Sequence, residues 1–341
     1  MTQAEQDRLR IGIAGCGYQG GRMMQTIARL KSMTVVACAD PDMERASTLA
    51  ARAGNAAPYS SVDDMLADAQ LDAVIVATSH DALAEVSLVV AQAGLHVLAE
   101  KPAAMSVAEL APVKKAVAEA GVCYMAGYSF RYVAALQQVH DLLAAGAVGE
   151  IVAIHGSIGT APLDAGWLSS LSTGGGPLFY IGSHLIDEVL WFVQDDPVEV
   201  YANVRYRADT GADETSAIEL GFAKGATAQL MVTQTSNWFI NNVDIYGRDG
   251  RISLRGFGFL DYEITAVSKT LPQYTTLTVI RPAVAPGEER IIMMHMPQLE
   301  EFAAAIRERR QPVMDIRVGR RVLQVIDGIY ASDRSGQVVS I

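Results

Sequence analysis

Residues 11–20 read IGIAGCGYQG, an apolar run followed by Gly15, Gly17 and Gly20 in G-x-G-x-x-G spacing, and the helix-like stretch GRMMQTIARL comes next. In such a strand–turn–helix unit the first glycine makes the tight turn, the second lets the backbone approach a diphosphate, and the third lets helix pack on strand. The helix N-terminus then directs unpaired N–H groups at the phosphates. The stretch predicts a dinucleotide-binding turn, with an ordinary structural βα turn as the alternative.

A second strand-like run, TVVACA at residues 34–39, ends in Asp40, twenty residues after Gly20. An acidic side chain at this distance hydrogen-bonds the adenosine ribose and repels a 2′-phosphate, so we expect NAD rather than NADP. His80 is expected to contact the dinucleotide or, as we favour, to face solvent. The cofactor-binding residues that we predict are Gly15, Gly17, Tyr18, Gln19, Gly20, Asp40, Thr78, Ser79, His80, Glu100 and Lys101.

The composition is that of a globular chain long enough for two domains, with 341 residues of which 50% are apolar. A formal net charge of −11 argues against nucleic acid or an anionic membrane as partner. The three cysteines are scattered without metal or redox spacing, which fits a reducing, cytoplasmic location. We expect residues 1–8 to form a polar tail rather than a signal peptide, and no run of 18 apolar residues to span a bilayer.

Strand and helix patterns alternate through residues 1–127, which is typical of a doubly wound parallel sheet. From Glu150 onward the pattern changes to longer strands with few helices between them, which predicts a large, mainly antiparallel open sheet. We therefore expect an α/β chain with a Rossmann domain over 1–127 and a substrate-binding and oligomerisation domain over 128–341. Helices are expected over 107–120, with Pro112 delaying or kinking the start, over 178–193 and over 296–309.

Glu100-Lys101-Pro102 comes directly after the predicted strand over residues 96–99. The carboxyl ends of strands in an open α/β sheet line the ligand crevice, so Lys101 is expected where the nicotinamide lies. Pro102 makes a cis peptide bond possible at this turn. The alternative is a surface lysine paired with Glu100.

The chain resembles the Gfo/Idh/MocA family of NAD(P)-dependent oxidoreductases, which act on sugars and cyclitols. The resemblance rests on GIAGCGYQG, AGLHVLAEKP at 93–102, AGYSFRY at 126–132, GGGPLFYIGSHLID at 174–187, FAAAIRERRQP and YASDRSGQVV, and so covers essentially the whole chain. It implies a Rossmann domain that binds the dinucleotide, an open-sheet α/β domain through which dimers or tetramers assemble, and a substrate held between the two domains.

A helix expected after Gly174-Gly175-Gly176 places Tyr180, His184, Asp187 and Glu188 on one face. The resemblance implies that His184 is the general base toward a substrate hydroxyl and that Lys101 binds and polarises the same oxygen. We therefore predict Lys101, His184 and Tyr180 as catalytic residues. The predicted substrate-binding residues are Lys101, Tyr128, Arg131, Trp167, Tyr180, His184 and Asp187.

Most dehydrogenases of the family carry an aspartate at the position of Tyr180. A phenol is neutral at pH 7 and cannot supply the negative charge of that aspartate. One hypothesis keeps the dehydrogenase chemistry, with Asp187 or another carboxylate orienting His184. The alternatives are a glycosidase that uses NAD transiently without net redox change, and a degenerate dinucleotide-binding regulator.

The remaining candidates are weaker. Trp191, His96 and His140 are expected to be structural, while His155 and His295 are expected at strands or strand edges near the crevice. No cluster of His, Cys and carboxylates has the spacing of metal ligands, so we expect no metal.

Overall fold

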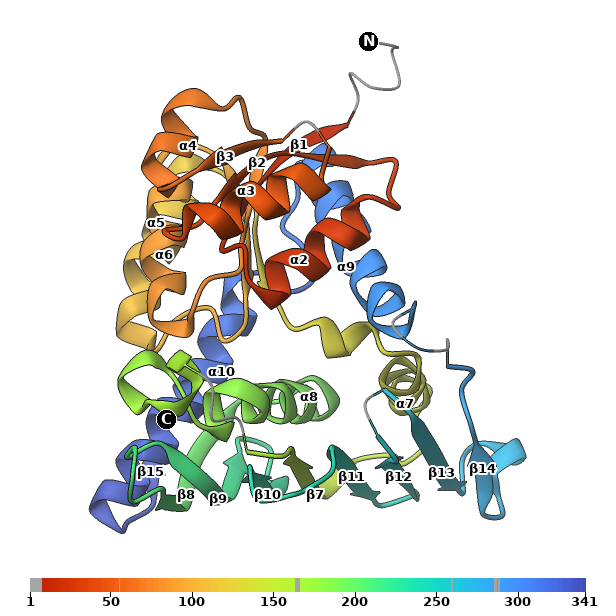
Figure 1. Cartoon of the computed structure of the whole chain (residues 1–341). Helices are drawn as coiled ribbons and strands as arrows, with labels where there is room; N and C mark the ends of the chain where they lie inside the picture. Colours follow the sequence, from red (N-terminus) through yellow and green to blue (C-terminus); the bar gives the residue numbers. More distant parts are fainter. Residues whose placement is uncertain (1–7, 55, 163–165, 259, 285–286, 288) are drawn as a thin grey trace. The chain divides into compact units, whose positions relative to one another are not determined.

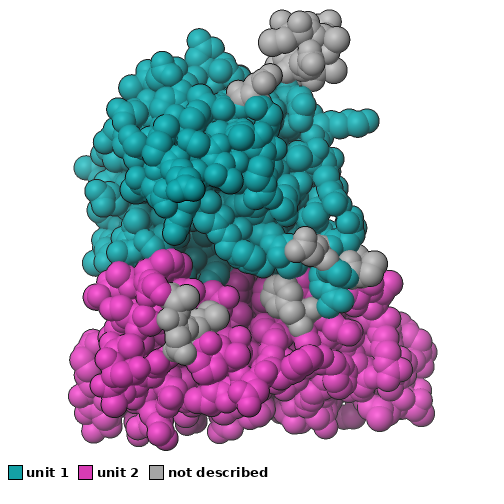
Figure 2. Space-filling model, viewed as in Figure 1, with its two compact units in different colours: residues 1–129, 286–320 teal, residues 130–285, 321–341 magenta. Residues whose placement is uncertain are grey.

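The computed structural model describes residues 8–341 except 55, 163–165, 259, 285, 286 and 288, so the expected polar tail lies almost entirely outside the described residues. The chain divides into two compact units, distinguished by colour in Figure 2. Unit 1 comprises residues 1–129 and 286–320, and unit 2 comprises residues 130–285 and 321–341. The expected second domain, 128–341, therefore differs from the structure, because residues 286–320 return to unit 1.

Unit 1 contains a six-stranded sheet in the order β3-β2-β1-β4-β5-β6, with every neighbouring pair parallel. Strands such as β4 are buried at every residue, as expected for a parallel sheet covered on both faces. The short β3 was not among the strands expected from the sequence. The strands are β1 (Leu9–Ala14), β2 (Met33–Ala39), β3 (Ala57–Tyr59), β4 (Ala73–Val76), β5 (His96–Glu100) and β6 (Tyr124–Gly127).

Local sequence signals mark both ends of helix α6 (Val107–Ala120). Ser106 Oγ accepts a hydrogen bond from the backbone N–H of Glu109 at 3.2 Å, and Gly121 closes the helix in the left-handed region. Pro112 lies inside this helix without delaying its start. The helices are α2 (Tyr18–Ile27), α3 (Met43–Arg52), α4 (Val62–Asp68), the 3₁₀ turn η1 (His80–Ala82), α5 (Leu83–Gln92), α6 (Val107–Ala120) and α9 (Glu289–Arg307).

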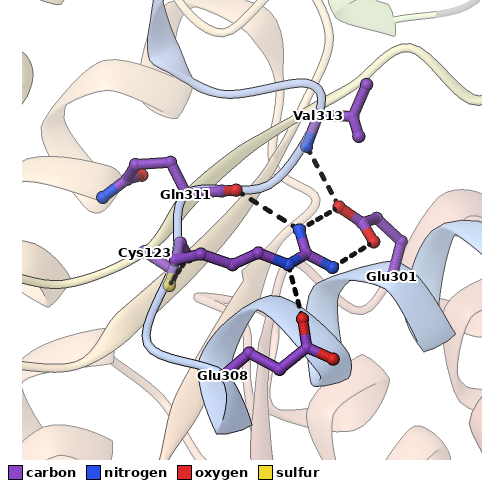
Figure 3. A network of polar contacts seen from close by, with 6 residues as sticks. Cys123, Glu301, Glu308, Gln311 and Val313 are labelled. Atoms are coloured by element: carbon purple, nitrogen blue, oxygen red, sulfur yellow. Dashed lines mark hydrogen bonds and ion pairs between the residues drawn. The ribbon is translucent and has the colours of Figure 1, made fainter.

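The segment that returns to unit 1 contains the polar network around Arg310 shown in Figure 3. The guanidinium of Arg310 donates to both carboxylate oxygens of Glu301, at 2.7 and 2.8 Å, and to Glu308 at 2.6 Å. The Cys123 thiol, just before β6, donates to the carbonyl of Arg310 at 3.1 Å. The Arg310 ion pairs lie within the segment itself, whereas the Cys123 bond and a bond from Gln311 Nε2 to the Val122 carbonyl at 3.4 Å join it to residues 1–129 of unit 1. No local sequence pattern indicated this return.

Unit 2 is built on a nine-stranded sheet in the order β14-β13-β12-β11-β7-β10-β9-β8-β15, antiparallel except for the parallel pair β7 and β10. Strand β13 was not expected from the sequence. The strands are β7 (Ile151–Gly159), β8 (Pro197–Tyr206), β9 (Asp213–Phe222), β10 (Thr227–Thr233), β11 (Ile240–Gly247), β12 (Gly250–Gly256), β13 (Tyr262–Ser268), β14 (Thr278–Ile280) and β15 (Val339–Ser340).

Helices α7 (Ala134–Ala144) and α8 (Ser183–Val193) lie on the same face of this sheet in Figure 1. Helix α10 (Ile316–Ser335) begins in unit 1 and continues into unit 2. Buried and exposed residues alternate along β10, as expected for a strand with one face packed and one face open. Within the described part of the chain, no helix combines the length and apolar character needed to cross a bilayer.

Candidate functional site

The glycine loop between β1 and α2 has the geometry of a diphosphate cradle. Gly15 has φ +94°, and a Cβ there would lie 2.4 Å from the carbonyl oxygen of Ala77, so only glycine fits. A Cβ at Gly20 would lie 2.1 Å from the carbonyl oxygen of Gly15, whereas one at Gly17 would meet nothing within 4 Å. Gly17 is the N-cap of α2 and has no side chain, so no N-cap side chain accepts from the first backbone N–H groups of the helix. The loop therefore leaves open space and backbone donors for an anion.

Asp40 lies beside this loop at the end of β2. One carboxylate oxygen accepts from the backbone N–H of Cys16 at 2.8 Å, and the other accepts from the N–H of Asp42 at 2.9 Å. A cavity of about 360 Å³ opens next to it, lined by Cys16, Gly17, Gly21, Asp42, Glu44, Arg45, Thr48, Leu49 and Arg52. The backbone thus fixes a negative charge between the glycine loop and this cavity.

Glu100 is the last residue of β5 and Lys101 follows it directly, and the Lys101–Pro102 peptide bond is cis. Glu100 is buried, and its side chain accepts from the backbone N–H of Lys101 at 3.3 Å and from Gln19 Nε2 at 2.7 Å. Burial raises the pKa of Glu100, which the nearby Lys101 partly opposes. Burial also lowers the pKa of Lys101 to about 8, against the opposing effect of Glu100. The shift brings the pKa of Lys101 closer to neutral pH.

The other predicted cofactor residues occupy two places in unit 1. Tyr18, at the start of α2, is 74% exposed, and its hydroxyl accepts from Arg22 at 2.8 Å. Thr78 and Ser79 follow β4 and lead into η1. His80, which we favoured as solvent-facing, is buried at 4% exposure, because it begins η1 instead of an open loop.

In unit 2, the turn Gly174–Gly176 is held by Asp213, which was not predicted from the sequence. A Cβ at Gly176 would lie 2.0 Å from Asp213 Oδ1. Asp213 Oδ2 accepts from the backbone N–H of Leu178 at 2.9 Å, and Oδ1 accepts from the Tyr330 hydroxyl at 3.1 Å. Burial raises the pKa of Asp213 to about 6. The sequence signal is limited to an acidic residue at the first position of strand β9.

The predicted helix 178–193 contains two kinds of winding: a π-helical turn, η5 (Leu178–Gly182), followed by α8. Tyr180 lies half-buried in the π-helical turn, a feature that is frequent at functional sites. His184, in the first turn of α8, is buried, and its imidazole stacks on the Phe130 ring with centroids 4.0 Å apart and planes 17° apart. Phe130 belongs to η2 (Ser129–Tyr132) and was missed, because an aromatic residue between strand and helix reads as ordinary core.

Asp187 forms a bidentate ion pair with Arg131. Arg131 Nε donates to Oδ2 at 2.8 Å and Nη2 donates to Oδ1 at 2.6 Å, and the two side chains are 12% and 2% exposed. The guanidinium also lies over the Trp191 ring, 5.3 Å from its centroid. The hypothesis that Asp187 orients His184 therefore gives way to a pair that joins η2 to α8.

Glu188, expected on the same helix face, is fully buried on another set of partners. Asn241 Nδ2 lies 3.0 and 3.3 Å from its two oxygens and 3.2 Å from the Tyr262 hydroxyl. Burial raises the pKa of Glu188 to about 8, with Asp187 adding to the shift and the Asn241 hydrogen bond opposing it. His184, Asp187 and Glu188 thus contact different partners.

The weaker candidates are placed as follows. Tyr128 is buried at 0% exposure just after β6, and Trp167, in η3 (Gly166–Ser169), is 37% exposed. His295 lies in α9, not at a strand edge, because Pro297 does not interrupt that helix. His155 lies exposed on β7, and His140 stacks on Trp191 with centroids 4.3 Å apart. Across the residues that the structure describes, no group of three or more His, Cys, Asp or Glu is placed to hold a metal ion.

Comparison with known proteins relates both parts of the chain to one family. Inositol 2-dehydrogenase 1 of Saccharopolyspora erythraea is 29% identical over 318 residues, covering 90% of this chain and 85% of the relative. D-xylose 1-dehydrogenase (NADP(+)) 2 of Haloferax volcanii is 25% identical over 338 residues, covering 98% and 100%. The solved structure of the WlbA dehydrogenase from Bordetella pertussis, in complex with NADH and UDP-GlcNAcA, has a TM-score of 0.83 and 26% identity, covering 98% and 99%.

Family models match the two parts separately. Residues 9–128 match the model described as oxidoreductase family, NAD-binding Rossmann fold, and residues 136–253 match the GFO/IDH/MocA C-terminal domain. The strand order of unit 1 and the mainly antiparallel sheet of unit 2 agree with these assignments. The chain belongs to the GFO/IDH/MocA family of oxidoreductases.

Proposed function

We propose that this protein is an NAD-dependent dehydrogenase or reductase that transfers a hydride between nicotinamide and a secondary alcohol or ketone of a sugar, glycoside or cyclitol. The names of the relatives support this substrate class, since they include an inositol and a D-xylose dehydrogenase. The observation that carries the proposal is the open glycine cradle at Gly17 in the same unit as Lys101, a half-buried lysine that directly follows β5.

The chain's residues fit a bound dinucleotide. The space at Gly17 and the uncapped start of α2 suit the diphosphate, and Asp40 suits the adenosine ribose. When bound, NAD supplies the nicotinamide carbon that takes the hydride from the carbinol carbon.

In this proposal His184 takes the proton of the substrate hydroxyl as general base, and its stacking on Phe130 fixes the plane of the ring. Lys101, when protonated, stabilises the negative charge that develops on the same oxygen. Tyr180 completes the polar set with a neutral hydroxyl. Trp167, which is 37% exposed, offers an aromatic face to the C–H surface of a sugar ring.

The buried pair of Arg131 and Asp187 supports the helix that carries His184. In this proposal its contribution to substrate binding is indirect, because the two side chains pair with each other.

We also propose that NAD is preferred over NADP. The Asp40 carboxylate is held beside the cradle by two backbone N–H groups, so a 2′-phosphate would meet a fixed negative charge. Comparing kcat/KM for the two cofactors tests this point, and an equal or higher value with NADP would contradict it.

The proposed reaction is tested with a panel of polyols, aldoses, glycosides and inositols in the presence of NAD. Formation of NADH with one of them supports the dehydrogenase. Release of an aglycone without net NADH would instead indicate the redox-neutral glycosidase, and NADH binding without any turnover would indicate a regulator. Replacing Lys101 or His184 with alanine should lower turnover by about two to four orders of magnitude.

We further propose a homodimer or homotetramer assembled through the sheet of unit 2, and a cytoplasmic location. Large side chains that are about 40% exposed stand on its strands, among them Tyr201, Met231 and Tyr246. Covering them on a second copy would bury apolar area. Changing Met231 and Tyr246 to lysine together should reduce the mass in light scattering, and an unchanged mass would contradict the assembly. A reducing compartment suits the buried free thiols of Cys16, Cys38 and Cys123.

A further inference from the structure

We propose that Gln19, His295 and Gln298 form a positioning relay that holds the Glu100 carboxylate beside Lys101, so that helix α9 takes part in the reaction. The inference rests on the proposed role of Lys101 and extends it to residues that have no place in the mechanism above. The relay joins three elements of unit 1: α2, which carries Gln19, β5, which ends in Glu100, and α9, which carries the other two residues.

Gln19 is the centre of the relay. Its Nε2 lies 2.7 Å from Glu100 Oε1 and 3.4 Å from His295 Nε2. An amide nitrogen has two N–H donors, so Gln19 can donate to both neighbours at once. The other oxygen of Glu100 accepts from the backbone N–H of Lys101 at 3.3 Å. Both carboxylate oxygens are therefore held by donors, one in the first turn of α2 and one at Lys101.

The hydrogen-bond pattern assigns the tautomer of His295. Because Gln19 donates to Nε2, that nitrogen is the acceptor, and the proton is on Nδ1, which lies 3.2 Å from Gln298 Oε1. His295 and Gln298 are 2% and 0% exposed. Burial lowers the pKa of His295 to about 4, and Arg22 adds to the effect, so the ring is neutral as the relay requires.

The relay has a chemical consequence at Lys101. Donation from Gln19 and the charge of Lys101 both lower the pKa of Glu100, against the rise caused by burial. An ionised Glu100 in turn raises the pKa of Lys101. Loss of the Gln19 donor should therefore favour protonated Glu100 and let the pKa of Lys101 fall, which leaves fewer enzyme molecules with a charged lysine.

Four variants separate this positioning role from a merely structural one. Gln19→Met and His295→Leu remove the relay, whereas His295→Gln keeps one donor and one acceptor and should rescue it. His96→Leu is the matched control, because it removes a half-buried imidazole of the same unit whose Nδ1 accepts from Cys123.

The main measurement uses the protein without cofactor or substrate. Competitive acetylation over a pH series, with the Lys101 peptide quantified by mass spectrometry, gives the titration midpoint of Lys101, and the exposed Lys114 and Lys115 serve as internal references. We expect the midpoint to fall in Gln19→Met and in His295→Leu, and to remain near the wild-type value in His295→Gln and His96→Leu. In folded variants, an unchanged midpoint in both Gln19→Met and His295→Leu would overturn the relay.

Kinetics provide the second readout. We expect His295→Leu to lower kcat about tenfold, the scale of a lost hydrogen bond near a charged group, while the Kd for NADH changes less than about twofold. A rise in that Kd with kcat and the Lys101 midpoint unchanged would instead make His295 a structural residue of the cofactor fold. The acetylation result does not depend on turnover, so failure of the relay and failure of the proposed function can be told apart.

Discussion

The Phe130 ring lies nearly parallel to the His184 imidazole, with 4.0 Å between the centroids and 17° between the planes. Phe239 meets the same phenyl ring edge-on, at a centroid distance of 6.4 Å. Stacked and edge-on aromatic contacts contribute roughly 0.5–1.5 kcal/mol each beyond buried area. The imidazole is therefore held by a small aromatic cluster within unit 2, which limits rotation of the proposed base.

Replacing Phe130 with leucine tests the importance of this stack. We expect kcat to fall about three- to tenfold, the rate equivalent of the stacking energy, because the imidazole samples unproductive orientations. Steady-state kinetics and NADH titration measure the effect, and the Kd for NADH should stay unchanged. Phe130→Tyr should retain near wild-type turnover. A leucine variant as fast as the wild type would show that the ring does not orient His184.

The Arg131–Asp187 pair should act mainly on stability. Asp187→Asn leaves a buried guanidinium without its counter-ion, so we expect the free energy of unfolding to fall by about 3 kcal/mol in urea titrations. The exposed pair of Arg248 and Glu150 gives a control, since Glu150→Gln should leave the unfolding midpoint almost unchanged. If Asp187→Asn instead kept its stability and lost turnover, Asp187 would orient the base after all.

Glu188 should make the protein less stable as pH rises. Its folded pKa of about 8 exceeds the ordinary glutamate pKa of 4.5, so the folded state holds the extra proton between these two pH values. The contribution of Glu188 to the free energy of unfolding is therefore highest below about pH 4.5, falls between about pH 4.5 and 8, and levels off above about pH 8. Glu188→Gln should remove up to about 1.4 kcal/mol per pH unit of this decline.

Urea titrations of wild type and Glu188→Gln across that window measure the difference. Buried Asp213 titrates in the same direction up to about pH 6 in both proteins, so it cancels in the comparison. The exposed Glu199→Gln variant should give a curve parallel to the wild type. Parallel curves for Glu188→Gln as well would mean that Glu188 is ionised in the folded protein.

The lowered pKa of Lys101 predicts that activity declines at alkaline pH. Its pKa is lowered to about 8, and the proposed reaction needs the ammonium form, so kcat/KM should decline above about pH 8. Lys101→Arg keeps the charge to much higher pH, so the residual activity of that variant should lack this limb. The same limb in Lys101→Arg would assign it to another group.

Local patterns predicted most of unit 1. The glycine spacing at Gly15–Gly20, the strand ending at Asp40 and the capping serine Ser106 act over a few residues, and the structure forms the expected turn, strand and helix at each. The candidate residues Lys101 and His184 likewise come from contiguous motifs, although their catalytic roles remain predictions.

Partners distant in sequence could not be predicted in this way. The Asp213 carboxylate reaches the N–H of Leu178 across 35 positions, and Phe130 reaches His184 from another element. Helix α9 was expected to begin at Met296, but it starts at Glu289 and includes Pro297, so His295 was misplaced. In each case tertiary packing decides what a side chain contacts, and a single sequence carries no periodic signal for it.

The discontinuity of unit 1 bears on how the protein is made. Translation delivers residues 1–129 first, but α9 and the Arg310 network, which complete the same unit, leave the ribosome only after most of unit 2 has been synthesised. A nascent chain that stops before residue 286 therefore lacks part of its cofactor-binding unit. Recombination that exchanges the first 129 residues alone would likewise separate these residues from the segment that completes their unit.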